Sequence, residues 1–184
     1  MAYSAEPVDI RPYFDLELLM TVSRETRLGG ALTERLMRLW EQWMPEAHVL
    51  RVRTEAAEYL AVWLNEKVEA DVDKTWDQSP SDAYFANALA QVLCMSAVHG
   101  ILPEIQDAGC APAPRMTDEL RAALSAAGLP YTPSGTPARR YSVVTPYPFQ
   151  GGCEICSLQS ACPKAQGAEE AASVLLPGYE KGRP

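Results

Sequence analysis

DAYFANALAQVLCMSAV, residues 82–98, is the most apolar stretch of the chain, with 13 apolar residues among its 17 positions. A helix that is apolar on nearly all sides is buried on all sides. The sequence therefore predicts a central helix here, with the other elements packed around it. Ser81 is its candidate N-cap, and His99 with Gly100 forms its expected last turn and C-terminal cap.

Three further helices are predicted before this stretch. Apolar residues are crowded between Phe14 and Arg27, and a second helix, ended by Pro45, carries an apolar face at helical spacing: Leu32, Leu36, Leu39, Trp40 and Trp43. A third helix is expected to start near Thr54, with another such face: Ala56, Leu60, Trp63, Leu64 and Val68. We therefore expect a mainly α fold, a bundle of four or five helices whose domain covers residues 1–110.

Residues 111–184 are expected to form a proline-rich segment that packs on this bundle, so that the chain is a single domain overall. Seven prolines between residues 111 and 150 prevent long regular elements. Short helices are predicted at 103–108, 117–128 and 168–176. The sequence YSVVT at 141–145 predicts one strand, and a lone short strand has little to pair with.

Composition and charge exclude several classes of protein. Of the 184 residues, 47% are hydrophobic and 22% are charged, which is typical of a soluble globular domain. No apolar run approaches the ~20 residues of a membrane span, and the sequence MAYSAEPVDIRP lacks the features of a signal peptide. We therefore expect a cytoplasmic protein without membrane contact. In that compartment, five cysteines indicate metal ligands or working thiols rather than disulfides.

The distribution of charge disfavours nucleic acid as a partner. Residues 1–136 carry 11 basic and 20 acidic side chains, and such an acidic body repels phosphate backbones. Arg139–Arg140 is the only close basic pair in the C-terminal part. A group of carboxylates is expected to form a solvated acidic face: Glu66, Glu69, Asp71, Asp73 and Asp77.

The sequence GGCEICSLQSACPKA, residues 151–165, carries the clearest chemical signal. Cys153, Cys156 and Cys162 have the spacing C-x2-C-x5-C. The first pair lets two thiolates converge on one metal centre, and an excursion of five residues returns a third thiolate to it. Gly151 and Gly152 permit a close approach of the backbone. Pro163 follows the last cysteine, as a proline does in bacterial ferredoxins.

A [4Fe–4S] cluster normally takes four cysteines. We select Cys110 as the fourth ligand, because it lies just past a predicted helix end, beside Gly109 and before the sequence APAP, where it is free to turn inward. The alternatives are Cys94, His99 or an open iron site. Cys94 lies in the most apolar helix, where a cysteine is usually a small buried hydrophobe. Zinc is the alternative metal, although structural zinc sites usually pair two such cysteine turns or add histidines.

The cysteine loop resembles the loops of three known kinds of iron–sulfur protein. It is similar to the C-x6-C-x2-C-x5-C loop of the endonuclease III and adenine-glycosylase family. It also resembles the cluster loop of RecB-family nucleases, in which a distant upstream cysteine completes the set, and the SPASM segment of radical enzymes. Each resemblance covers about a dozen residues and implies a [4Fe–4S] cluster on Cys110, Cys153, Cys156 and Cys162 rather than one activity.

The chain departs from each family where activity is decided. Pro146 stands at the position of the glycosylases' first cysteine, and Gln166 at the position of the radical enzymes' fourth. The sequence also contains no G-x-x-x-x-G-K, G-x-G-x-x-G or G-x-S-x-G motif. We therefore expect no substrate chemistry of its own, and predict a cluster that is structural or serves electron transfer or sensing for a partner protein.

Two alternative functions remain open. One is a DNA-processing protein related to the glycosylases or nucleases, supported only by Arg139, Arg140 and Lys164 near the loop. The other is a zinc-stapled helical protein with an interaction or chaperone-like role. Metal analysis and DNA binding in low salt discriminate between these classes.

Overall fold

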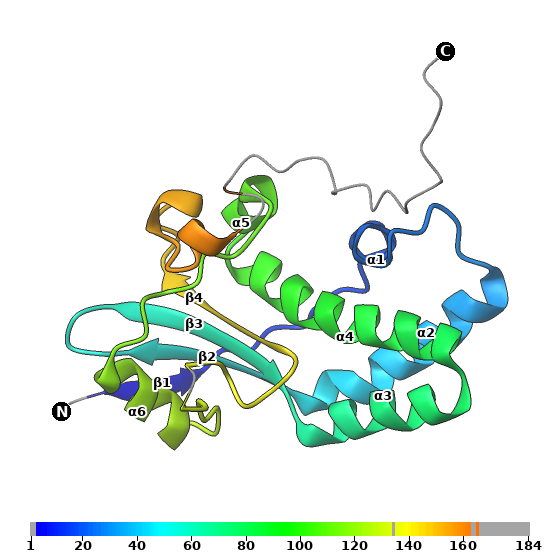
Figure 1. The fold of residues 1–184 in the computed structure, drawn as a ribbon, viewed down its shortest axis with the longest axis horizontal. Helices are drawn as coiled ribbons and strands as arrows, with labels where there is room; N and C mark the ends of the chain where they lie inside the picture. The colour runs from blue at the N-terminus through cyan, green and yellow to red at the C-terminus, as the bar shows by residue number, and fades with distance from the viewer. Residues whose placement is uncertain (1–2, 134, 163–164, 166–184) are drawn as a thin grey trace, which may run out of the picture.

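The computed structural model describes residues 3–133, 135–162 and 165 (Figure 1). Its strands are β1 (Ser4–Pro7), β2 (Ala47–Arg53), β3 (Glu58–Leu64) and β4 (Ser142–Tyr147). Its α-helices are α1 (Leu16–Ser23), α2 (Gly30–Trp43), α3 (Glu66–Gln78), α4 (Pro80–Ile101), α5 (Glu104–Ala108) and α6 (Asp118–Ala126). Three 3₁₀ turns complete the set: η1 (Met44–Glu46), η2 (Cys153–Ile155) and η3 (Gln159–Ala161).

The prediction of a mainly α helical bundle over residues 1–110 is wrong, and so is the description of the chain as all-α. The fold is a mixed α/β arrangement in which four antiparallel strands lie in the order β1-β2-β3-β4. The helix expected from Thr54 is instead strand β3 followed by α3, and β2 precedes it. A short apolar run such as YLAVWL does not distinguish a buried strand from a buried helix by its periodicity.

Strand β3 is buried on both of its faces, which explains why its sequence shows no alternation. Leu60, Val62 and Leu64 belong to one apolar core, which includes residues of α2, α3 and α4. Ala61 and Trp63 belong to a second core, which includes residues of α6. Because successive side chains of a strand point to opposite faces, α4 covers one face of the sheet and α6 covers the other (Figure 1).

The central helix is confirmed, with longer bounds than its apolar stretch. Helix α4 begins after Ser79, whose hydroxyl accepts a hydrogen bond from the N–H of Asp82, so the N-cap is Ser79 and not Ser81. It continues through Gly100 to Ile101, so Gly100 is not its C-terminal cap. Although α4 is the only described helix long and apolar enough to cross a membrane, 56% of its apolar window is buried inside the fold. Such burial is typical of a core helix in a soluble protein.

The proline-rich segment contributes directly to the sheet. The predicted strand is confirmed as β4, but it is not alone, because it pairs antiparallel with β3 in a register that joins Trp63 to Ser142 and Glu58 to Tyr147. The helix predicted at 117–128 is confirmed as α6, capped by Thr117, and the turn predicted at 103–108 is α5. The helix predicted at 168–176 lies outside the described residues.

Candidate functional site

The cysteine loop follows β4 and is built from two short 3₁₀ turns, η2 and η3, which lie against each other. Gly151 starts it in the left-handed region, with φ +135°. The carboxylate of Glu154 accepts a hydrogen bond from the N–H of Gly152 at 2.9 Å. A hydrogen bond from the N–H of Glu154 itself, together with the bond from Gly152, lowers the pKa of the Glu154 carboxyl. Glu154 therefore fixes the glycine turn that opens the loop.

Hydrogen bonds within the loop set the positions of its three cysteines. The N–H of Cys156 donates to the carbonyl of Cys153 at 3.2 Å and closes the C-x2-C turn. The N–H of Cys162 donates to the carbonyl of Gln159 at 3.3 Å. All three cysteines are half-buried. They are thus partly sheltered from water while remaining near the surface.

The loop is fastened to the segment that follows Cys110. The N–H of Ser157 donates to the carbonyl of Ala113 at 2.8 Å, and the hydroxyl of Ser157 donates to the carbonyl of Pro114 at 3.0 Å. In return, the N–H of Ala113 donates to Sγ of Cys156 at 3.4 Å. No local sequence signal indicated Ala113, Pro114 or Ser157, because these contacts join residues 43 or 44 positions apart.

Cys110 lies near this junction. Helix α5 ends at Ala108; its C-cap, Gly109, turns the chain with a φ of +72°, and Cys110 is the next residue. Cys110, Ser157 and Leu158 line the same cavity. The structure therefore brings the predicted fourth ligand to the region of the cysteine loop, and in Figure 1 the orange loop lies beside the chain that leaves α5.

The four cysteines do not form a closed metal site in this structure. Within residues 3–133, 135–162 and 165, no three His, Cys, Asp or Glu side chains are grouped so that they could hold a metal ion. The iron–sulfur and metal-binding predictions therefore receive no support from a preformed ligand group. All five cysteines lie in the described part of the chain, and none of them forms a disulfide.

The two alternative ligands lie in α4, apart from the loop. Cys94 is 2% exposed within the larger apolar core, and burial raises the pKa of its thiol to about 12. His99 is also buried, and burial lowers its pKa below the ordinary value. Its Nδ1 has no hydrogen-bond partner among the described residues. Neither residue lines the cavity that Cys110 shares with the loop.

The basic pair is bound by the acidic residues of α3. Arg139 forms an ion pair with Glu66 at 2.6 Å, and Arg140 contacts both carboxylate oxygens of Asp73 at 2.7 and 3.1 Å. The backbone N–H of Arg140 donates to Glu69. The predicted acidic face is thus partly neutralised, and both guanidinium groups are engaged by carboxylates. Lys164 lies outside the described residues.

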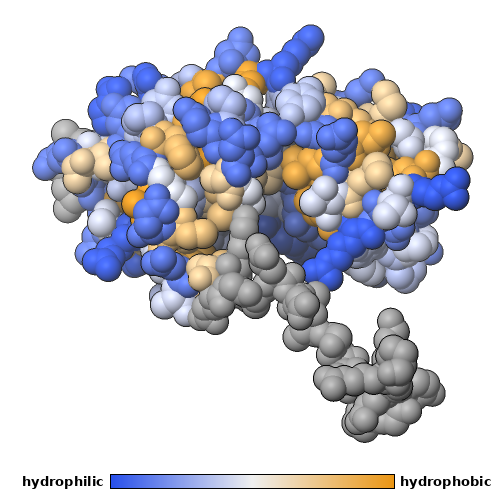
Figure 2. Space-filling view, turned by 90° about the horizontal axis from the view of Figure 1, so that it is seen from above, coloured by the Kyte–Doolittle hydropathy of each residue, from blue (hydrophilic) through white to orange (hydrophobic). Residues whose placement is uncertain are grey.

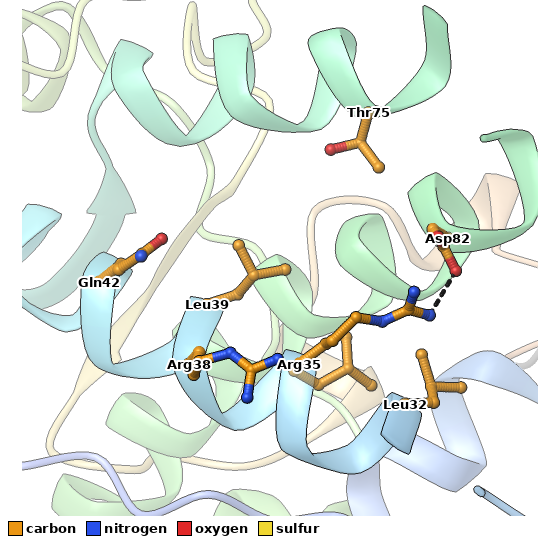
Figure 3. A pocket seen from close by; sticks show the side chains of 8 residues that line it. Leu32, Arg35, Arg38, Leu39, Gln42, Thr75 and Asp82 are labelled. Atoms are coloured by element: carbon orange, nitrogen blue, oxygen red, sulfur yellow. Dashed lines mark hydrogen bonds and ion pairs between the residues drawn. The ribbon is translucent and has the colours of Figure 1, made fainter. Parts of the chain in front are cut away.

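A second hollow lies between α2, α3 and α4, with a volume of about 330 Å³ (Figure 3). Its apolar wall comes mainly from α2, through Leu32, Leu36 and Leu39. Arg35 in this hollow forms an ion pair with Asp82 at 2.7 Å. The hollow contains no cysteine, and this ion pair joins α2 to the start of α4.

Comparison with known proteins gives the chain no relatives: no family model, no curated protein and no solved structure matches it.

Proposed function

We propose that this chain is a cytoplasmic iron–sulfur protein whose [4Fe–4S] cluster is held by Cys110, Cys153, Cys156 and Cys162. The observation that carries the proposal is the junction between the three-cysteine loop and the segment after Cys110. Ser157 and Cys156 are hydrogen-bonded to Ala113 and Pro114, so the two parts of the ligand set are anchored to each other. Reduced thiols of this kind persist in the cytoplasm.

The chemistry of the donors favours a cluster. Amide hydrogen bonds to cysteine sulfurs are among the interactions that set the reduction potential of a cluster, and Sγ of Cys156 already accepts one. A cubane offers a separate iron to each cysteine, so its ligands surround a bulky group rather than meet at one ion. Among the described residues, no member of either apolar core comes from the loop.

The surface of the loop favours a partner protein. Leu158 is 60% exposed and Ile155 is 38% exposed, on a molecule whose visible surface is largely hydrophilic with scattered apolar patches (Figure 2). When bound, the cluster would supply one-electron chemistry close to this apolar surface. The proposed role is therefore electron exchange with a docked protein, and the chain performs no substrate chemistry of its own.

Anaerobic purification followed by iron, sulfide and zinc analysis tests the cluster. We expect about four irons and four sulfides per chain and a broad absorbance near roughly 400 nm. Cys110→Ala should lower the iron content at least twofold. Cys94→Ala is the matched control, because Cys94 is a buried core residue, and it should retain the full iron content. Stoichiometric zinc, absence of both metals, or a loss of iron in Cys94→Ala alone would contradict the proposal.

A redox titration separates electron exchange from a purely structural role. A reversible one-electron wave, with the iron retained in both states, is expected for an electron-transfer centre. A cluster that keeps its iron but shows no reversible wave would instead be a structural link. Binding to DNA in low salt that weakens strongly as salt rises would favour the DNA-processing alternative.

A further inference from the structure

A hollow about twice as large as the one between α2, α3 and α4 lies along one edge of the sheet. Its volume is about 660 Å³, within the range of ligand and peptide pockets. Its walls come from α1, α4, β4 and the chain around residues 109–116, 131, 135–137 and 157–158. We name this hollow the β4 groove.

The first feature of the β4 groove is an open strand edge. The N–H of Leu64 donates to the carbonyl of Tyr141, so Leu64 and Tyr141 form a hydrogen-bonded pair. Along an antiparallel pair of strands, hydrogen-bonded and non-hydrogen-bonded residue pairs alternate. Counting from Tyr141, the backbone N–H and C=O groups of Val143 and Thr145 therefore point toward β3. The N–H and C=O groups of Ser142 and Val144 therefore point away from β3, and no described residue forms a backbone hydrogen bond to them.

The position of Pro146 agrees with this alternation. Proline lacks an N–H, and within sheets it is found where that N–H would face away from the neighbouring strand. Like Ser142 and Val144, Pro146 lies at a position whose backbone points away from β3. The N–H that it lacks would therefore not have bonded to β3. It also limits the open edge, which leaves the part from Ser142 to Val144 available to an added strand.

The second feature is the lack of charge among the described lining residues. Of the described residues that line the β4 groove, none is acidic, basic or histidine. By contrast, the hollow between α2 and α4 contains Arg35, Arg38 and Asp82. Burying a charged group without a partner is costly, so the β4 groove favours an uncharged occupant. An open strand edge with apolar walls is the arrangement used for strand addition.

We propose that the β4 groove is a docking site for an extended, uncharged segment of a partner protein, which adds to the edge of β4 beside Ser142 and Val144. Two residues with outward N–H and C=O groups offer four backbone hydrogen bonds to such a strand. The apolar walls would accept its alternate side chains. The proposal goes beyond the cluster and does not require it, although Cys110 and Ser157 in the wall place the docked segment next to the cysteine loop.

The probe for this site is a phage-displayed library of linear heptapeptides, selected on the immobilised full-length chain. We expect enriched peptides to be uncharged over four or more consecutive residues. Ser142→Pro removes the outward N–H and should reduce their binding at least tenfold, whereas Ser142→Ala keeps that donor and should bind as the natural chain does. In hydrogen exchange, a synthetic copy of an enriched peptide should protect the amides of Ser142 and Val144.

A second variant keeps the test valid if Ser142→Pro fails to fold. Thr21 is exposed on α1 and lines the β4 groove, so Thr21→Glu places a charge in its wall and should weaken binding at least tenfold. Thr33→Glu is the matched control, because Thr33 also bonds the carbonyl four residues earlier in its helix but lies outside the groove.

Several outcomes would overturn the proposal. These are no enrichment, enrichment of charged peptides, or binding that Ser142→Pro and Thr21→Glu leave unchanged. A chain that sediments as a dimer and loses the dimer in Ser142→Pro would show that a second copy covers the groove. A small apolar molecule that co-purifies with the chain and competes with the peptides would show that a low-molecular-weight ligand occupies the groove.

Discussion

At the scale of single residues, the five cysteines occupy two distinct environments. Cys94 is 2% exposed inside α4, whereas the cysteines at 110, 153, 156 and 162 are half-buried near the junction of two chain segments. Thiolates, rather than thiols, react with alkylating reagents and bind metals. Because burial raises the pKa of Cys94 to about 12, its thiolate is scarce at neutral pH. This difference in burial distinguishes Cys94, a core residue, from the four candidate ligands, and it can be measured in the metal-free protein.

We predict that Cys94 resists alkylation in the folded, metal-free protein. In iodoacetamide at about pH 8, a thiol with a pKa near 12 holds only a minute fraction of thiolate and is also shielded by α4 and its neighbours. Mass spectrometry should find label on the other cysteines and on Cys94 only after unfolding in urea. Labelling of Cys94 at the rate of Cys156 in the folded protein would contradict its burial.

The ion pair between Asp73 and Arg140 makes a second prediction, on pH dependence. A hydrogen bond from Arg140 holds the pKa of Asp73 below its ordinary value of 3.8. Since the folded state has the lower pKa, the pair stabilises the fold above pH 3.8, and this stabilisation is lost as the pH falls through the lowered value. Asp73→Asn should therefore lower the urea midpoint slightly at pH 7 and have a diminishing effect toward pH 3.

Asp77→Asn is the control for that measurement. Asp77 belongs to the same helix but forms no ion pair with the described residues. Its replacement should leave the urea midpoint nearly constant at both pH values. An effect of Asp73→Asn that grows on acidification would show that the pair does not stabilise the fold.

At the scale of elements, α6 depends on its N-cap. The hydroxyl of Thr117 accepts a hydrogen bond from the N–H of Leu120, a residue of the second core. Thr117→Ala should destabilise the fold by about 1 kcal/mol. For a chain of this length, that loss lowers Tm by roughly 2–4 °C in thermal unfolding followed by circular dichroism. Thr117→Ser retains the hydroxyl and should unfold near the natural temperature, whereas equal losses in both variants would exclude the cap.

Local sequence signals predicted the helices that begin at a capping residue or contain a long apolar run. Thr117 marks the start of α6, and the apolar length of residues 82–98 identifies α4. The sequence did not predict strands β2 and β3, and the reason is physical. β3 is covered on both faces, so its sequence YLAVWL lacks the alternation of a half-buried strand, and the sequence AHVLRVR of β2 alternates only in part. The partner of β4 lies about 80 residues away, beyond any local pattern.

The candidate site was predictable only in its local part. The three cysteines Cys153, Cys156 and Cys162 and their spacing are visible in the sequence. Their residue type and spacing indicate metal chemistry without any knowledge of the fold. The approach of the Cys110 segment arises from hydrogen bonds between backbone groups of Ala113 and Ser157, which leave no trace in residue identity. The β4 groove likewise results from the order of the strands rather than from a motif.

At the scale of the whole molecule, the cysteine loop lies outside the two apolar cores of the fold. The two apolar cores contain residues of the sheet and of helices α1 to α6. Among the described residues, no member of either core comes from 150–162. Hydrogen bonds to Ala113 and Pro114 fasten the loop to the body. A bound cluster would therefore add the strongest link between this loop and the fold.

This arrangement predicts that removal of the cluster frees the loop and leaves the body folded. Anaerobically purified protein is treated with an oxidant and a chelator, and hydrogen exchange is then followed by mass spectrometry. Amides of residues 153–162 should exchange at least tenfold faster, because hydrogen bonds to residues 113–114 hold the loop less firmly than a cluster that joins its three cysteines to Cys110. Amides of β3 and α4 should keep their protection, since their cores exclude the loop. In Cys110→Ala, loop exchange should be fast before treatment and unchanged by it. Faster exchange throughout β3 and α4 would instead mean that the cluster supports the whole fold, and an unchanged loop would mean that the hydrogen bonds alone hold it.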